Sequence, residues 1–200
     1  MQVRTSPVNL PGFVVVRLNG RTTTKRARQT VPMRTATGTT PPRVEPRHWV
    51  RALGNALNLS TALGLLVALA GRSSFRVGPE ALVVAEGYRL PLPKAGAFTV
   101  GNVVVVPHGL LAGVEARQPG TMAHEARHSW QYFWCLGLPF LPLYAAASGW
   151  SWLRRGDPAS GNWFERDAGL HRGGYPDHPV SNAGFARIGR ALRLGAERRR

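Results

Sequence analysis

Two histidines four residues apart, with a glutamate directly after the first, lie within the stretch TMAHEARHSWQYFW (121–134). On an α-helix, residues four apart lie on one face, so His124 and His128 can direct their imidazoles at a single ion. This arrangement is typical of the two-histidine helix of zinc hydrolases. The alternative is an ordinary helix with two surface histidines and a solvated glutamate.

The glutamate in this motif suits proton transfer better than metal binding. Glu125 lies about a sixth to a third of a turn round the helix from the histidine face. There it can take a proton from a zinc-activated water. Gln131 lies seven residues beyond His124, so we expect it on the same face, where it lines the pocket or orients a ligand.

A catalytic zinc site needs a third protein ligand, and the residues just after His128 contain no further histidine. The candidates further along the chain are Glu165, Asp167, His171, Asp177 and His178. Glu165 is favoured because NWFERDAGL indicates a helix that can present one carboxylate to the HEARH helix. The alternative is structural, since Asn162 with Glu165 three residues later forms a capping box that needs no metal.

Three segments together resemble a family of small bacterial proteins of unassigned activity: AHEARHSWQY, GLPFLPLYAAASGWSW and NWFERDAG. That family carries HExxHxxQ, an LPxY stretch and N-x-F-E-x-x-A, and it is similar to the gluzincin-type zincins. The resemblance implies that His124, His128 and Glu165 bind zinc. It also implies that Glu125 is the general base.

The sequence departs from the gluzincin pattern at one position. Gluzincins usually carry an aspartate four residues after the ligand glutamate, where it holds a zinc-bound histidine, and here Gly169 occupies that position. Asp167 is the candidate to supply this contact instead. Tyr144 and His171 are further candidates for the pocket, where either can stabilise an oxyanion.

The surrounding elements predict an α+β, zincin-like domain over 73–183. Short runs rich in Val and aromatic residues, punctuated by Gly and Pro, indicate a small antiparallel sheet between 74 and 107. The HEARH helix should begin near Thr121 and end before Gly137. Further helices are expected from Asn162 and, as a basic amphipathic C-terminal helix, over 184–200.

An apolar helix is expected over 48–72, and its charge-free part (52–71) has about the length that crosses a bilayer. Four polar residues lower its hydrophobicity: Asn55, Asn58, Ser60 and Thr61. They favour a buried or interfacial helix over a membrane span. A second charge-free stretch, 129–153, contains or adjoins five of the six tryptophans, which suits either a membrane interface or a tight core.

The net charge of +16 comes from the two ends of the chain. Residues 1–51 carry ten Lys/Arg against one acid, and 184–200 carry six Arg against one acid, whereas 52–183 is nearly balanced. Basic ends are typical of solvated arms or surface anchors, so we expect no specific nucleic-acid binding. Residues 1–47 are rich in Arg and Thr and predict a disordered basic tail.

The sequence also bears on the compartment. Cys135 is the single cysteine, which excludes an intrachain disulfide and a cysteine-based zinc knuckle. The apolar run at 12–16 is too short for a signal-peptide core and ends at Arg17, so we expect no secretory signal peptide. The protein is then cytoplasmic or membrane-associated. A transit peptide, or a true start at Met33, is the alternative interpretation of the first residues.

Together these residues predict a zinc-dependent metallopeptidase in which zinc-activated water attacks a peptide carbonyl and Glu125 is the base. We expect the peptide or protein substrate to lie extended along a sheet edge that AFTVGNVVVV provides. Two other classes stay open. One is a membrane-associated protein with a non-catalytic metal site, and the other binds nucleic acid through its basic tails.

Overall fold

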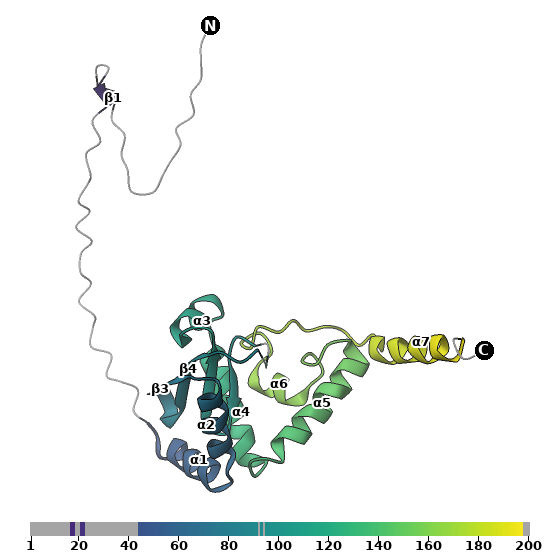
Figure 1. The fold of residues 1–200 in the computed structure, drawn as a ribbon, viewed down its shortest axis with the longest axis horizontal. Helices are drawn as coiled ribbons and strands as arrows, with labels where there is room; N and C mark the ends of the chain where they lie inside the picture. Colours follow the sequence, from purple (N-terminus) through teal and green to yellow (C-terminus); the bar gives the residue numbers. More distant parts are fainter. Residues whose placement is uncertain (1–16, 19–20, 23–43, 92, 94, 198–200) are drawn as a thin grey trace. The chain divides into compact units, whose positions relative to one another are not determined.

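The computed structural model describes residues 17–18, 21–22, 44–91, 93 and 95–197. In its N-terminal unit, Arg17–Leu18 (β1) pairs antiparallel with Arg21–Thr22 (β2). Most of the tail expected over 1–47 lies outside the described residues. The second unit holds the remaining elements, which are four strands and seven α-helices within the described part of the chain (Figure 1).

A small mixed sheet forms the centre of the second unit. Its strands are β3 (Ser74–Val77), β4 (Val83–Tyr88), β5 (Phe98–Val100) and β6 (Val103–Pro107). They are ordered β3-β4-β6-β5, so β6 lies between β4 and β5. β3 pairs antiparallel with β4, and β5 pairs antiparallel with β6, whereas β4 and β6 are parallel. A three-residue 3₁₀ turn (Pro79–Ala81) precedes β4.

The sheet expected to be antiparallel therefore contains one parallel pair at its centre, and that part of the prediction was wrong. The physical reason is visible in the sequence of β6. Val103, Val104, Val105 and Val106 are all fully buried, so both faces of the strand are covered. A strand buried on both faces loses the alternation of apolar and polar residues, and such unbroken apolar runs are typical of parallel strands.

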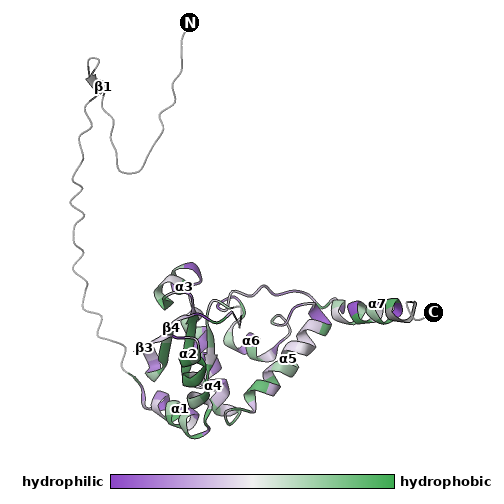
Figure 2. Cartoon of the chain, viewed as in Figure 1, coloured by the Kyte–Doolittle hydropathy of each residue, from purple (hydrophilic) through white to green (hydrophobic). Residues whose placement is uncertain are grey.

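Helices cover both faces of the sheet. On one face, Ala68 of α2 (Ser60–Ala70) belongs to an apolar cluster with Val103 and Val105. On the other, α3 (Leu111–Arg117) and α4 (Thr121–Trp134) pack on Val104 and Val106. The result is a three-layer core, and Figure 2 shows the strongly hydrophobic residues concentrated in α2 and the strands.

The apolar segment expected to be one helix over 48–71 is two helices, α1 (Pro46–Leu57) and α2, bent by 77°. Its polar residues make internal bonds, since the Asn55 side chain donates to the Ser129 carbonyl at 2.9 Å and Ser60 Oγ lies 2.7 Å from Asn58 Oδ1. No single described helix is long and apolar enough to cross a membrane. By length and composition alone, the bent pair α1–α2 meets that test.

Two further helices follow α4 and frame the candidate site. The chain turns at 135–139 into α5 (Phe140–Arg155), and α6 (Trp163–Ala168) packs against α4. The basic amphipathic helix expected near the C-terminus is α7 (Ala183–Glu197), which contacts α5. Thus α4 and α6, which carry HEARH and NWFERDAG, lie side by side.

Candidate metal centre

The helix α4 places both motif histidines on its buried face. His124 and His128 are each less than a tenth exposed, and their rings meet edge to face with centroids 4.6 Å apart. The two Nε2 atoms are 3.0 Å apart. The spacing of four residues therefore brings both ring nitrogens to one point, as expected from the helical period.

The third residue at this point comes from α6. Glu165 is buried, and its carboxylate oxygens lie 3.2 Å from His124 Nε2 and 3.6 Å from His128 Nε2. The helix begins at Asn162, whose side chain accepts a hydrogen bond from the Phe164 N–H at 2.9 Å. Asn162 caps α6 without help from Glu165, because the glutamate turns inward to the histidines.

Hydrogen bonds on the far side of each ring place a proton on Nδ1 of both histidines. His124 Nδ1 lies 3.1 Å from the Gly169 carbonyl oxygen, which can only accept, so Nδ1 carries the proton. His128 Nδ1 lies 2.8 Å from Gln131 Oε1. The amide of Gln131 cannot be flipped, since its nitrogen donates to the Phe164 carbonyl at 2.9 Å and to Asp167 Oδ2 at 2.8 Å.

As a result, the Nε2 atoms of His124 and His128 and the Glu165 carboxylate face one another. Glu165 Oε2 is buried and accepts no hydrogen bond, although it lies 3.2 Å from His124 Nε2. A buried carboxylate oxygen is costly unless a cation lies beside it. Only a cation at this point, either a metal ion or a proton, makes the arrangement favourable. Tetrahedral zinc with bonds of about 2.1 Å separates its ligand atoms by roughly 3.4 Å, close to the spacing observed here. His124, His128 and Glu165 can therefore hold a metal ion.

The pKa directions agree with mutual stabilisation inside this cluster. Burial lowers the pKa of His124, but the Glu165 and Glu125 carboxylates outweigh it and leave the pKa raised. Burial likewise raises the pKa of Glu165, and the two histidines with Tyr144 outweigh it and leave the pKa lowered. The site thus favours a cationic imidazole beside an anionic carboxylate whenever no metal ion is bound.

Glu125 borders the cluster without belonging to it. Its carboxylate is buried, and the Thr99 hydroxyl of β5 lies 2.8 Å from Oε2. Burial is the main cause that raises the pKa of this carboxyl group. Glu125 lines the same cavity as the three clustered residues, so it is placed to exchange a proton with a group bound there.

The contact expected from an aspartate at position 169 is made by the backbone. Gly169 holds His124 through its own carbonyl, so the departure from the gluzincin pattern leaves the histidine supported. Asp167 acts on the other histidine, through Gln131. Arg127 of α4 binds both oxygens of Asp167 at 2.8 Å and is the main cause of its lowered pKa.

Two tyrosines, Tyr144 and Tyr175, line the cavity beside the cluster. Tyr144 donates a hydrogen bond to Glu165 Oε1, so it orients a candidate ligand. Tyr175 lines the cavity, with its ring centroid 6.1 Å from that of His124, and sequence reasoning missed it. The feature of the sequence that could have pointed to Tyr175 is the pair Gly173–Gly174 directly before it. A β-carbon at Gly173 would lie 2.5 Å from His124 Cε1, so only glycine lets this loop approach the site.

His171 is exposed and lies outside the cavity lining.

The cluster opens into a cavity of about 770 Å³. Its walls come from α2, β5, α5 and the loop that carries Tyr175, and most of the lining is apolar. β5 is an edge strand. Because Val100 and Val103 flank a two-residue turn, the Thr99–Val104 pair does not exchange hydrogen bonds. The Thr99 N–H and C=O therefore point to the open edge, beside Glu125.

Comparison of the chain with protein-family models, with curated proteins and with solved structures gives no match. The assignment of this site therefore rests on its own geometry.

Proposed function

We propose that this protein is a zinc-dependent peptidase with a zincin-like catalytic site. The observation that carries the proposal is the convergence of three buried side chains, His124, His128 and Glu165, whose possible ligand atoms all lie within 4.8 Å of one another. A second glutamate, Glu125, lies beside them in the same cavity. This set of ligands and base is the one that zinc-assisted hydrolysis requires.

The metal ion, when bound, supplies a Lewis acid that polarises a carbonyl and lowers the pKa of water. Glu125 takes the proton of the attacking water as the water oxygen bonds to the peptide carbon. It then gives this proton to the departing amine as the C–N bond breaks. The Tyr175 hydroxyl, which lines the cavity beside His124, is the candidate donor to the carbonyl oxygen.

The substrate class follows from the edge strand. By the register of β5 with β6, the Thr99 N–H and C=O face away from β6, and Thr99 lines the cavity, so an extended peptide can pair there as an additional strand. The Thr99 side chain lies 2.8 Å from Glu125 Oε2, which brings the bound backbone next to the base. A peptide rather than a compact small molecule suits an open strand edge.

The experiment is a zinc determination followed by a peptide-library assay. About one zinc per chain is expected in the wild type, and we expect Glu165→Ala and His124→Ala/His128→Ala to lose it. Glu125→Gln should keep the zinc and lose hydrolysis by about 10²–10⁴-fold. Thermal unfolding of each variant shows whether a loss of zinc comes from the missing ligand or from an unfolded protein.

Two results would overturn the proposal. Wild-type protein that takes up no zinc, even when zinc is supplied, has no metal-assisted chemistry. Zinc bound without cleavage of any library peptide would instead assign a non-catalytic metal site. Binding of nucleic acid that disappears when 1–47 and 184–200 are removed leaves the proposal intact, because it belongs to the basic ends of the chain.

A further inference from the structure

Two turns of the second unit bring five exposed apolar side chains to one region, which we call the apolar tip. The turn between α1 and α2 contributes Leu57 and Leu59, and the turn between α4 and α5 contributes Trp134, Leu136 and Leu138. The two turns touch, because the Asn58 side chain packs directly against Gly137. The tip is thus one surface built from segments far apart in the sequence.

The leucines at the tip occupy an unfavourable backbone conformation. Leu59 has φ 65° and Leu136 has φ 58°, in the left-handed region that glycine and asparagine adopt most easily. Their side chains are 62% and 78% exposed, so neither gains from burial in the fold. A strained and exposed leucine at both turns indicates that the side chains serve a contact outside the chain.

The absence of charge within the two segments that form the tip indicates the chemistry of that contact. No charged residue occurs in 52–71 or in 129–153, the two helical hairpins that meet there. The bend between α1 and α2 lies at the tip, and this pair has the length and composition of a broken span or a re-entrant loop. A surface that projects leucine and tryptophan from turns suits the acyl-chain boundary of a bilayer.

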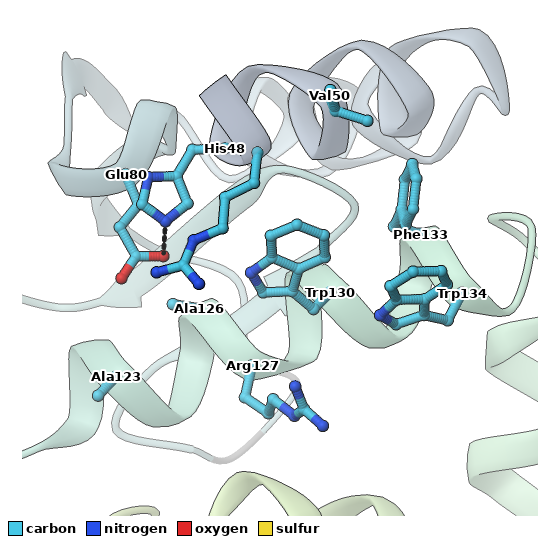
Figure 3. Close-up of a pocket in the computed structure, with 10 residues that line it drawn as sticks. His48, Val50, Glu80, Ala123, Ala126, Arg127, Trp130, Phe133 and Trp134 are labelled. Carbon is cyan, nitrogen blue, oxygen red and sulfur yellow. Dashed lines mark ion pairs between the residues drawn. The ribbon is translucent and has the colours of Figure 1, made fainter. Parts of the chain in front are cut away.

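The groove beside the tip carries the side chains that belong at a membrane interface. Trp130 and Trp134 line it between α1 and α4 (Figure 3). Tryptophan places its apolar ring towards the hydrocarbon and its N–H towards the headgroups. The net charge of +16 also matches an anionic surface.

We propose that the apolar tip inserts into the interface of an anionic lipid bilayer and holds the protein on the membrane surface. Leu59 and Leu136 enter the acyl-chain boundary, and Trp134 lies at headgroup level. This docking does not depend on the metal centre or on peptide hydrolysis.

The test compares full-length wild type with Leu59→Asn/Leu136→Asn in sedimentation with vesicles of phosphatidylcholine and phosphatidylglycerol. Asparagine accepts the left-handed conformation, so the double variant should fold at least as well as the wild type. We expect its partition coefficient to fall by about tenfold or more, because two leucines no longer leave water. The matched control is Leu110→Asn, since Leu110 is 63% exposed but lies outside the tip, and it should bind like the wild type.

The salt dependence separates the tip from the basic ends of the chain. At high salt the attraction of the arginines is screened, and the difference between wild type and double variant should persist. Equal partition of the two proteins, or an equal loss in Leu110→Asn, would overturn the proposal. So would a wild type that binds no vesicles and forms a dimer that the double variant cannot form, because a second copy would then cover the tip.

Discussion

At the scale of single residues, Gln131 decides which nitrogen of His128 is free. It accepts from His128 Nδ1 at 2.8 Å, and its amide nitrogen donates to Asp167 and to the Phe164 carbonyl. The lone pair of His128 Nε2 is directed at the cluster only because this orientation is fixed. The hydrogen bonds that orient the candidate ligand His128 are therefore as specific as its own placement.

Gln131→Ala should lower the zinc affinity by about 10–100-fold, because His128 then loses the acceptor that fixes its tautomer and its ring orientation. Competition with a chromophoric chelator at fixed pH measures the change. His108→Ala removes an exposed histidine outside the site and should leave the affinity unchanged. Full affinity in Gln131→Ala would contradict the role given to this side chain.

Asp167 gives a pH-dependent prediction for the metal-free protein. Arg127 lowers the pKa of this carboxyl group, so its contribution to stability is present above the ordinary value of about 3.9 and is lost as the pH falls through the lowered pKa. Arg127 is half exposed, so the pair contributes only about 0.5–1 kcal/mol.

Urea unfolding of wild type and Arg127→Gln should therefore differ by about this amount at neutral pH and converge in acid. A difference in the free energy of unfolding that stays constant down to acid unfolding would show that Asp167 does not carry it.

At the scale of elements, α2 and α5 both line the cavity, but the glycine of α2 is packed closely against a neighbour and the glycine of α5 is not. A β-carbon at Gly64 of α2 would lie 2.3 Å from the Val100 carbonyl oxygen, which belongs to the backbone of β5. A β-carbon at Gly149 of α5 would have no atom within 4 Å. The same substitution should therefore have opposite effects in the two helices.

Gly64→Ala should destabilise the fold by about 1–3 kcal/mol, because the clash with β5 outweighs the better helix propensity of alanine. Gly149→Ala should stabilise it by about 0.5–1 kcal/mol, through that propensity alone. Chemical denaturation of both variants measures the two signs. A stabilising Gly64→Ala would mean that α2 does not lie as close to β5 as described.

The sequence predicted those elements whose signal is local. The spacing of His124 and His128 and the N-cap at Asn162 indicated α4 and α6, because a helical period and a cap depend on a few neighbouring residues. The parallel pairing of β4 with β6 depends on a distant strand, so valine-rich runs alone did not reveal it. The bend at Leu59 was missed because leucine is not a usual left-handed residue.

The same distinction applies to the site. Its candidate ligands carry recognisable motifs, whereas the support of His124 comes from a backbone carbonyl, at Gly169, that any residue possesses. Tyr175 lies in a loop whose course is set by close packing on His124, and no spacing rule reports such an approach.

At the scale of the whole molecule, the candidate ligands connect two helices that are far apart in sequence. His124 and His128 belong to α4 and Glu165 to α6, so a metal ion bound among them ties these helices together. Because the unfolded chain does not hold these residues at one point, metal binding free energy adds to the stability of the fold.

Zinc at about 100 times its dissociation constant should add about 2.7 kcal/mol to the free energy of unfolding. For a chain of this size, that raises Tm by about 5–10 °C. Thermal scans with zinc and with a chelator measure the shift. Glu125→Gln should keep the full shift, because Glu125 stands outside the ligand set, whereas Glu165→Ala should abolish it. An equal shift in Tm in both variants would place the zinc elsewhere on the chain. No shift in the wild type would mean that zinc binding at this cluster does not stabilise the fold.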